Sequence, residues 1–182
     1  MRNLIFQMLT SVDGYFEGPN GELDWHNVGL DWNTYVFELF EEVDTLLFGR
    51  RTYEMMAAYW PTETDDPIAE KMNSFPKIVF SNALKSADWA NSRIASDAVA
   101  EVRKLLQQPG KSMVIFGSSD LAVSLMREGL IDDFRIVVSP IVLGNGKPLF
   151  HGFNERYKLN FLKTKNFQSG HVMIYYRPDR SA

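Results

Sequence analysis

Alternation is the feature of this 182-residue sequence that most constrains its fold. Short apolar runs, typical of buried strands, alternate with segments whose apolar residues recur at helical spacing. The runs that predict strands are 4–9, 45–48, 77–80, 113–116 and 134–139, and residues 92–95 are a candidate for a further short strand. The segments that predict helices are 35–43, 52–59, 67–74, 97–106 and 119–126. This order favours a mostly parallel sheet with helices on both faces.

The C-terminal third breaks the alternation. Residues 157–167 and 172–177 both read as strands, and Ser169-Gly170 lies between them without a helix. Two strands joined by so short a turn predict an antiparallel hairpin at one edge of the sheet. We find no internal repeat or linker, and the length suits one domain covering residues 1–182.

A long polar segment follows the first strand. It runs from Thr10 to about Asp31 and contains several glycines. Loops near 20 residues are uncommon inside compact domains, and those that occur are often lids or binding loops. We therefore expect this segment to be a lid or a binding loop.

Composition removes several classes of function. The chain has no cysteine, which excludes disulfides, thiolate catalysis and thiolate metal sites. Its net charge of −4 and lack of a basic stretch argue against nucleic-acid binding. No apolar run is long enough for a signal peptide or a membrane span, so we expect a cytoplasmic protein. His26, His151 and His171 lack metal-ligand spacing, so we expect no metal.

Two turns carry the pattern of a strand, a glycine and a helix. The first is Phe48-Gly49-Arg50-Arg51-Thr52, and the second is Phe116-Gly117-Ser118-Ser119-Asp120-Leu121. Helix N-termini at the carboxyl ends of strands bind phosphate through free N–H groups and the helix dipole. Thr52 could cap the first helix, and the two arginines could neutralise a pyrophosphate or a ribose 2′-phosphate. The alternatives are a solvated charged pair at a helix start, and an ordinary N-cap at Ser119.

At these residues the chain resembles a known superfamily. Residues 43–54, which end in Phe-Gly-Arg-Arg-Thr-Tyr-Glu, resemble the strand–Gly-Arg-x-Thr–helix of dihydrofolate reductases. Residues 10–16 resemble the S-x-D-G segment of the reductase domain of riboflavin biosynthesis, and residues 140–150 resemble its P-x-x-L-G-x-G-x-x-L-F segment. The resemblance spans residues 3–177 and is closest to the C-terminal reductase domain of the bifunctional deaminase–reductase.

The resemblance implies a three-layer αβα sandwich, NADPH as hydride donor and a homodimer. It implies reduction of a small heterocyclic substrate, as in 5-amino-6-(5-phosphoribosylamino)uracil reductase. One alternative is a dihydrofolate reductase, whose folate-binding carboxylate would fall at about Asn33, two residues after Asp31. The other alternative is a non-catalytic NADPH-binding module.

The resemblance also implies that residues 16–25 form the lid, and it suggests which residues bind the cofactor. The backbone near the end of the first strand would meet the nicotinamide, and the two glycine turns and Ser81-Asn82 would hold the phosphates. The cofactor-binding residues that we expect are Leu9, Thr10, Val12, Gly49, Arg50, Arg51, Thr52, Ser81, Asn82, Phe116, Gly117, Ser118, Ser119 and Leu121.

Catalytic and substrate-binding candidates lie mainly in the N-terminal third. Asp13 is our first candidate for the proton donor, and Asp31 is the second; the alternatives are a turn residue and a helix-start acid. Aromatic side chains could stack on a planar substrate, and a glycine loop could approach it closely. The substrate-binding candidates are Phe16, Trp25, Tyr35, Tyr53, Leu143 and Gly144. For the aromatic residues the alternative is core packing.

Overall fold

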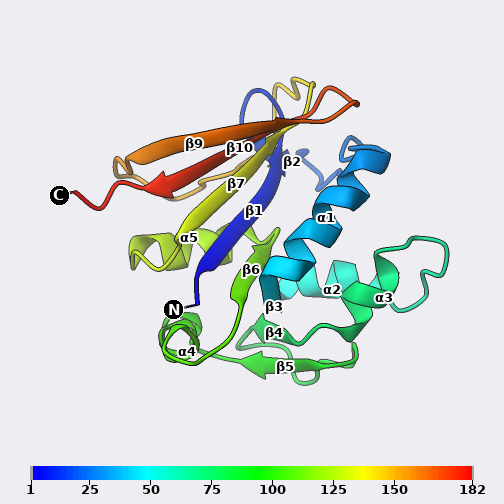
Figure 1. Ribbon diagram of the computed structural model, residues 1–182, viewed down its shortest axis with the longest axis vertical. Coiled ribbons are helices and arrows are strands. Elements are labelled where there is room, and N and C mark those ends of the chain that lie inside the picture. The colour runs from blue at the N-terminus through cyan, green and yellow to red at the C-terminus, as the bar shows by residue number, and fades with distance from the viewer. Residues whose placement is uncertain (1, 182) are drawn as a thin grey trace.

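The computed structural model describes residues 2–181 and has a large mixed sheet at its centre (Figure 1). The strands are β1 (Leu4–Thr10), β2 (Tyr15–Glu17), β3 (Val43–Gly49), β4 (Lys77–Phe80), β5 (Ser92–Ala95), β6 (Ser112–Phe116), β7 (Asp133–Val138), β8 (Lys147–Pro148), β9 (Leu159–Asn166) and β10 (Val172–Pro178). The helices are α1 (Leu30–Glu42), α2 (Arg50–Tyr59), α3 (Ala69–Ser74), α4 (Ala98–Leu106) and α5 (Ser119–Arg127).

The main sheet has eight strands in the order β5-β4-β3-β6-β1-β7-β10-β9. From β5 to β7 every neighbouring pair is parallel, whereas β10 is antiparallel to both β7 and β9. The predicted mostly parallel sheet with a C-terminal antiparallel hairpin is therefore confirmed. The carboxyl ends of β1, β3, β4 and β6 share one edge, and the site lies there.

Helices cover both faces of this sheet, which gives the expected three layers (Figure 1). On one face α1, α2 and α3 bury side chains such as Leu39, Tyr53 and Met72 in one apolar cluster. On the other face α4 and α5 bury Leu105 and Leu125 in a second cluster. Alternate residues of β3 supply both clusters, because successive strand residues point to opposite faces.

Two boundaries differ from the sequence-based expectation in ways that affect the site. Helix α2 begins at Arg50, so Thr52 is its third residue and does not cap it; Gly49 holds the N-cap position. The expected lid is not wholly irregular, since β2 pairs with β8 in a small separate sheet. Sequence patterns did not predict this pair, because strands of three and two residues are too short for a period and join segments far apart in the chain.

Candidate functional site

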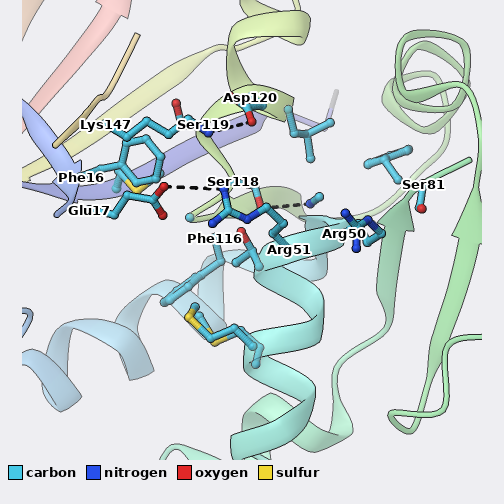
Figure 2. Close-up of a pocket in the computed structure, with 18 of the residues that line it drawn as sticks. Phe16, Glu17, Arg50, Arg51, Ser81, Phe116, Ser118, Ser119, Asp120 and Lys147 are labelled. Atoms are coloured by element: carbon cyan, nitrogen blue, oxygen red, sulfur yellow. Dashed lines mark hydrogen bonds and ion pairs between the residues drawn. The ribbon is translucent and has the colours of Figure 1, made fainter. Parts of the chain in front are cut away.

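A cavity of about 760 Å³ lies at the carboxyl ends of β1, β3, β4 and β6 (Figure 2). Its floor comes from the strand ends, and its walls come from the first turns of α2 and α5. The segment after β2 lines it too, through Gly21, Leu23 and His26. The volume lies in the range of small-molecule and cofactor sites, and the position is the one at which open α/β sheets bind ligands.

The first turn of α2 brings free backbone donors to the cavity. The N–H groups of Arg50, Arg51 and Thr52 have no partner within the helix, because the first turn of any helix lacks the preceding carbonyls. Gly49 carries no side chain, and its own N–H donates to Ser118 Oγ at 3.0 Å. The cavity therefore meets a backbone with free donors and a partial positive charge.

Two successive residues with positive φ lead into α5. Gly117 has φ of 72°, and Ser118, which is not a glycine, has φ of 58°. Ser118 occupies the N-cap position, and its Oγ accepts the N–H of Gly49. Ser119 Oγ donates to the carbonyl of Leu149. The contact between Gly49 and Ser118 fixes the two helix N-termini side by side. A diphosphate lying across both turns would meet two dipoles at once.

Three cations line the cavity, and each is paired with a carboxylate. Arg50 Nη1 donates to both carboxylate oxygens of Glu54 at 3.1 Å. Arg51 lies 3.7 Å from Glu17 in the lid, and Lys147 lies 2.9 Å from Asp120 (Figure 2). The arginine side chains are 47% and 68% exposed, and pairs so open to water hold together weakly. A phosphate could therefore compete for either guanidinium.

Ser81 and Asn82 also line the cavity, from the turn after β4. Ser81 Oγ accepts the N–H groups of Ala83 and Leu84 at 3.1 and 2.9 Å. Its hydroxyl hydrogen remains available as a donor. This turn thus lies where the sequence placed it, beside the α2 turn.

The expected cofactor residues on β1 separate into two groups. Leu9 lines the cavity together with Gln7 and Met8. Thr10 is buried and lies outside the lining, and Val12 is 61% exposed with its N–H donated to Ile141. The side chains of Thr10 and Val12 therefore do not face the cavity, because the chain turns away from it after Leu9.

Neither candidate proton donor lines the cavity. The Asp13 carboxylate accepts the N–H groups of Leu143 and Gly144 at 3.1 and 2.8 Å. Hydrogen bonds to Ser11 and to these two backbone groups hold the pKa of Asp13 below its usual range. Asp31 accepts the N–H of Gln168 at 2.7 Å, at the turn of the β9–β10 hairpin. In the structure, both carboxylates hold backbone loops in place.

The glycine loop before β8 supports the lid. A Cβ on Gly146 would stand 2.3 Å from the carbonyl oxygen of Glu17, so only glycine allows β2 to pack there. Leu143 and Gly144 lie outside the cavity lining and are held by Asp13. In the structure these two residues shape the loop and do not line the cavity, although the sequence suggested that they contact the substrate.

Of the four aromatic candidates, Phe16 alone lines the cavity. Tyr35 and Tyr53 belong to the apolar core, and their hydroxyls bond to Gln7 Oε1 at 2.9 Å and to the N–H of Trp89 at 3.0 Å. Trp25 packs edge-on against His26, with ring centroids 4.2 Å apart. Core packing thus accounts for both tyrosines.

The sequence reasoning missed several lining residues. Met55 is 45% exposed and lines the cavity. Glu17, His26 and Lys147 line it too. The sequence could have found Glu17 and His26 from their position in or beside the expected lid, and Lys147 from its place in the resembling segment 140–150. Within residues 2–181 no three His, Asp or Glu side chains are grouped to hold a metal ion, and no helix is long and apolar enough to cross a membrane.

Comparison with known proteins identifies relatives of the whole chain. The family model of the RibD C-terminal domain matches residues 2–173. An uncharacterized protein of Bacillus subtilis (strain 168), YyaP, is 35% identical over 180 residues, which cover 96% of this chain and 94% of YyaP.

Two solved structures show the same fold. A putative riboflavin biosynthesis protein from Shewanella sp. PV-4 has a TM-score of 0.80 and 28% identity, and the match covers 99% of this chain and 100% of that one. The dihydrofolate reductase of Enterococcus faecalis, solved with NADP(H) and RAB-propyl, has a TM-score of 0.66 and 18% identity, with coverage of 97% and 96%.

Proposed function

The chain belongs to the family of RibD C-terminal domains, and from that premise we propose that it is an NADPH-dependent reductase of a small heterocycle. The family and the dihydrofolate-reductase-like fold support a reductase-type function. The cofactor and the substrate are the parts that we add.

One observation carries the cofactor proposal. The N-termini of α2 and α5 meet at one side of the cavity, joined by the bond from the Gly49 N–H to Ser118 Oγ. In this proposal the diphosphate lies across both turns, and Arg50 or Arg51 pairs with the ribose 2′-phosphate that distinguishes NADPH from NADH. The bound nicotinamide supplies the hydride, and the chain supplies alignment and exclusion of water.

The apolar part of the lining suits the exclusion of water. Leu9, Met55, Met56 and Phe116 line the cavity, and Phe16 approaches it from the lid. Such a surface repels water and accepts a flat ring. Because Asp13 and Asp31 anchor loops, we assign proton transfer to water rather than to either carboxylate.

The substrate proposal follows the riboflavin branch. The relative from Shewanella is described as a putative riboflavin biosynthesis protein, which favours an aminopyrimidine such as 5-amino-6-(5-phosphoribosylamino)uracil. Folate is the second candidate. Asp31 argues against folate, because its carboxylate accepts the N–H of Gln168 outside the cavity.

Nicotinamide fluorescence tests the cofactor assignment. We expect NADPH to bind more tightly than NADH, and Arg50→Ala or Arg51→Ala to weaken NADPH by roughly tenfold to a hundredfold, the worth of a lost charge-assisted hydrogen bond. Arg103→Ala is the matched control, because Arg103 forms an exposed pair with Glu128 away from the cavity lining. Equal binding of both cofactors by all four proteins would refute the 2′-phosphate role.

Turnover separates the remaining alternatives. Oxidation of bound NADPH by the ribosylaminopyrimidine supports the riboflavin-type reductase, and oxidation by dihydrofolate supports the folate enzyme. NADPH binding without oxidation by a broad panel of imines and carbonyls would favour a non-catalytic binding module.

We also propose a homodimer that forms through β9. This strand is the last of the sheet order, and Phe161 and Leu162 on it are 62% and 45% exposed. Exposed edge strands readily pair with another copy. Sedimentation at micromolar concentration should show a dimer that Phe161→Lys disrupts, and a monomeric parent protein would refute the proposal.

A further inference from the structure

Gln7 is a buried polar residue on β1 that lines the cavity. It is only 1% exposed, and its Oε1 accepts the hydroxyl hydrogen of Tyr35 at 2.9 Å. Its Nε2 has no hydrogen-bond partner within residues 2–181, yet it is not among the unpartnered polar atoms there that lie out of contact with solvent. The small exposed part of Gln7 therefore includes Nε2, and it opens onto the cavity that this residue lines.

A chain of buried groups fixes the orientation of this carboxamide. Arg135 is the register neighbour of Gln7 on β7, and its Nη2 donates to Glu42. The Nη1 of Arg135 lies 3.5 Å from the Tyr35 hydroxyl oxygen. A guanidinium can only donate, so the single hydrogen of that hydroxyl is left for Gln7 Oε1. Burial raises the pKa of Tyr35, which keeps this hydrogen in place at neutral pH. Because Oε1 faces Tyr35, the two N–H groups of Nε2 point to the other side.

The side chain of Gln7 lies on the face of the sheet that α1 covers. Leu9, Met56 and Phe116 line the cavity and pack against the apolar cluster beneath α1. Gln7 points to the same face as Leu9, two residues along the strand, and it is the register neighbour of Phe116. Phe116 and Ser81 lie well apart in the cavity (Figure 2). The Gln7 end is thus an apolar wall with one pair of donors, which suits a flat ring better than a phosphate.

Donors in such a wall select strongly among ligands. A carbonyl oxygen that fills the pocket satisfies an N–H group, whereas a ligand that cannot accept leaves it buried and unpaired. We propose that Gln7 Nε2 donates a hydrogen bond to a ring carbonyl oxygen of the substrate, a planar oxo-heterocycle such as a pyrimidinone, and that Tyr35 positions it. The proposal rests on the proposed function, because it places the substrate ring at the Leu9 end of the same cavity.

Calorimetry on the protein saturated with NADP⁺ compares two pyrimidines. The first, 5,6-diaminouracil, has two ring carbonyl oxygens, and the second, 2,4,5,6-tetraaminopyrimidine, has amino groups in their places. The unmodified protein should bind the first about tenfold or more tightly. Gln7→Glu keeps an acceptor for Tyr35 but removes the N–H groups, so it should weaken 5,6-diaminouracil about tenfold and abolish the preference. Gln108→Glu makes the same change at an exposed residue outside the cavity lining and should alter neither affinity.

Tyr35→Phe tests the positioning role. Without the hydroxyl the carboxamide of Gln7 can turn, so the ratio of the two affinities should fall severalfold. A purely structural role of Tyr35 would lower stability and leave the ratio unchanged. No binding of 5,6-diaminouracil, or equal losses of both compounds in Gln7→Glu, would overturn the inference.

Side-chain amide signals of the unmodified, ¹⁵N-labelled protein cover the case in which a variant fails to fold. With NADP⁺ at saturation, the Nε2 signals of Gln7 should move on addition of 5,6-diaminouracil and stay in place with 2,4,5,6-tetraaminopyrimidine. Signals that move with NADP⁺ alone, and no further with 5,6-diaminouracil, would assign Gln7 to the cofactor and overturn the inference. Failure of the unmodified protein to bind NADPH would instead refute the proposed function.

Discussion

Gly117 affects both the stability of the fold and the proposed binding of NADPH, and its replacement by alanine tests both. Its φ of 72° is a conformation that alanine adopts only with strain. A Cβ built there stands 3.2 Å from Thr52 Cγ2, closer than an ordinary contact. Gly117→Ala should therefore strain the turn and also push the first turns of α2 and α5 apart.

The two effects have different sizes and can be separated. The left-handed backbone costs about 1 kcal/mol or a little more for alanine. The close contact with Thr52 adds about 1 kcal/mol more, since overpacked sites relax only in part. Gly129 supplies the matched control: its φ is 65°, and a Cβ there meets nothing within 4 Å. Gly129→Ala should show the backbone cost alone.

Denaturant unfolding and NADPH titration together measure the outcome. Gly117→Ala should lower the free energy of unfolding by about 2 kcal/mol, or the midpoint temperature by roughly 4–8 °C, about twice the effect of Gly129→Ala. Of the two alanine variants, only Gly117→Ala should bind NADPH more weakly than the unmodified protein. Adding Thr52→Ser, which removes the contacting methyl group, should restore the part of the stability, about 1 kcal/mol, that is lost to the close contact. Identical stabilities of the two alanine variants with unchanged NADPH binding would refute this reasoning.

Three further predictions concern residues around the cavity. Burial lowers the pKa of His26 from 6.5 to about 4, so the unfolded chain binds the proton more readily than the folded one. The unfolding free energy should therefore fall by at most about 3 kcal/mol as the pH drops from 6.5 to 4. In an acid titration, His26→Phe should flatten that fall. Lys77 is 1% exposed and its Nζ donates to three carbonyls, so Lys77→Met should cost about 3 kcal/mol in denaturant unfolding; a neutral change would contradict this role. Asp13→Asn should speed amide exchange at Gly144 and spare NADPH affinity; lost affinity would tie Asp13 to the cofactor.

The fold could be predicted largely because its signals are local. Most of the parallel strands are largely apolar runs, as for strands buried on both faces, whereas the edge strand β5 is Ser-Arg-Ile-Ala and has a weaker signal. Glycine, serine or proline follows most of these strands. The helix cap at Asp97 is a further local signal, since its carboxylate accepts the N–H of Ala100 at 2.9 Å. The β2–β8 pair escaped prediction because its register depends on a contact between Gly146 and Glu17 across the chain.

The site could be predicted less completely. The two glycine turns were found because a phosphate-binding helix start has a local signature. Asp13 was suggested as a proton donor from its place beside the nicotinamide segment, and its bonds to Leu143 and Gly144 could not be read from the sequence. His26 was passed over because a lone histidine has no spacing to interpret. Its unpaired nitrogen is visible only after folding.

Amide chemical shifts offer the most direct test of the central claim, that the first turns of α2 and α5 hold the phosphates of NADPH. On addition of NADP⁺ to ¹⁵N-labelled protein, the amide signals of residues 50–52 and 119–121 should show the largest changes. NAD⁺ should produce a weaker effect at residues 50–52, where the 2′-phosphate would bind. Changes confined to other surfaces, or none at saturating NADP⁺, would contradict the account.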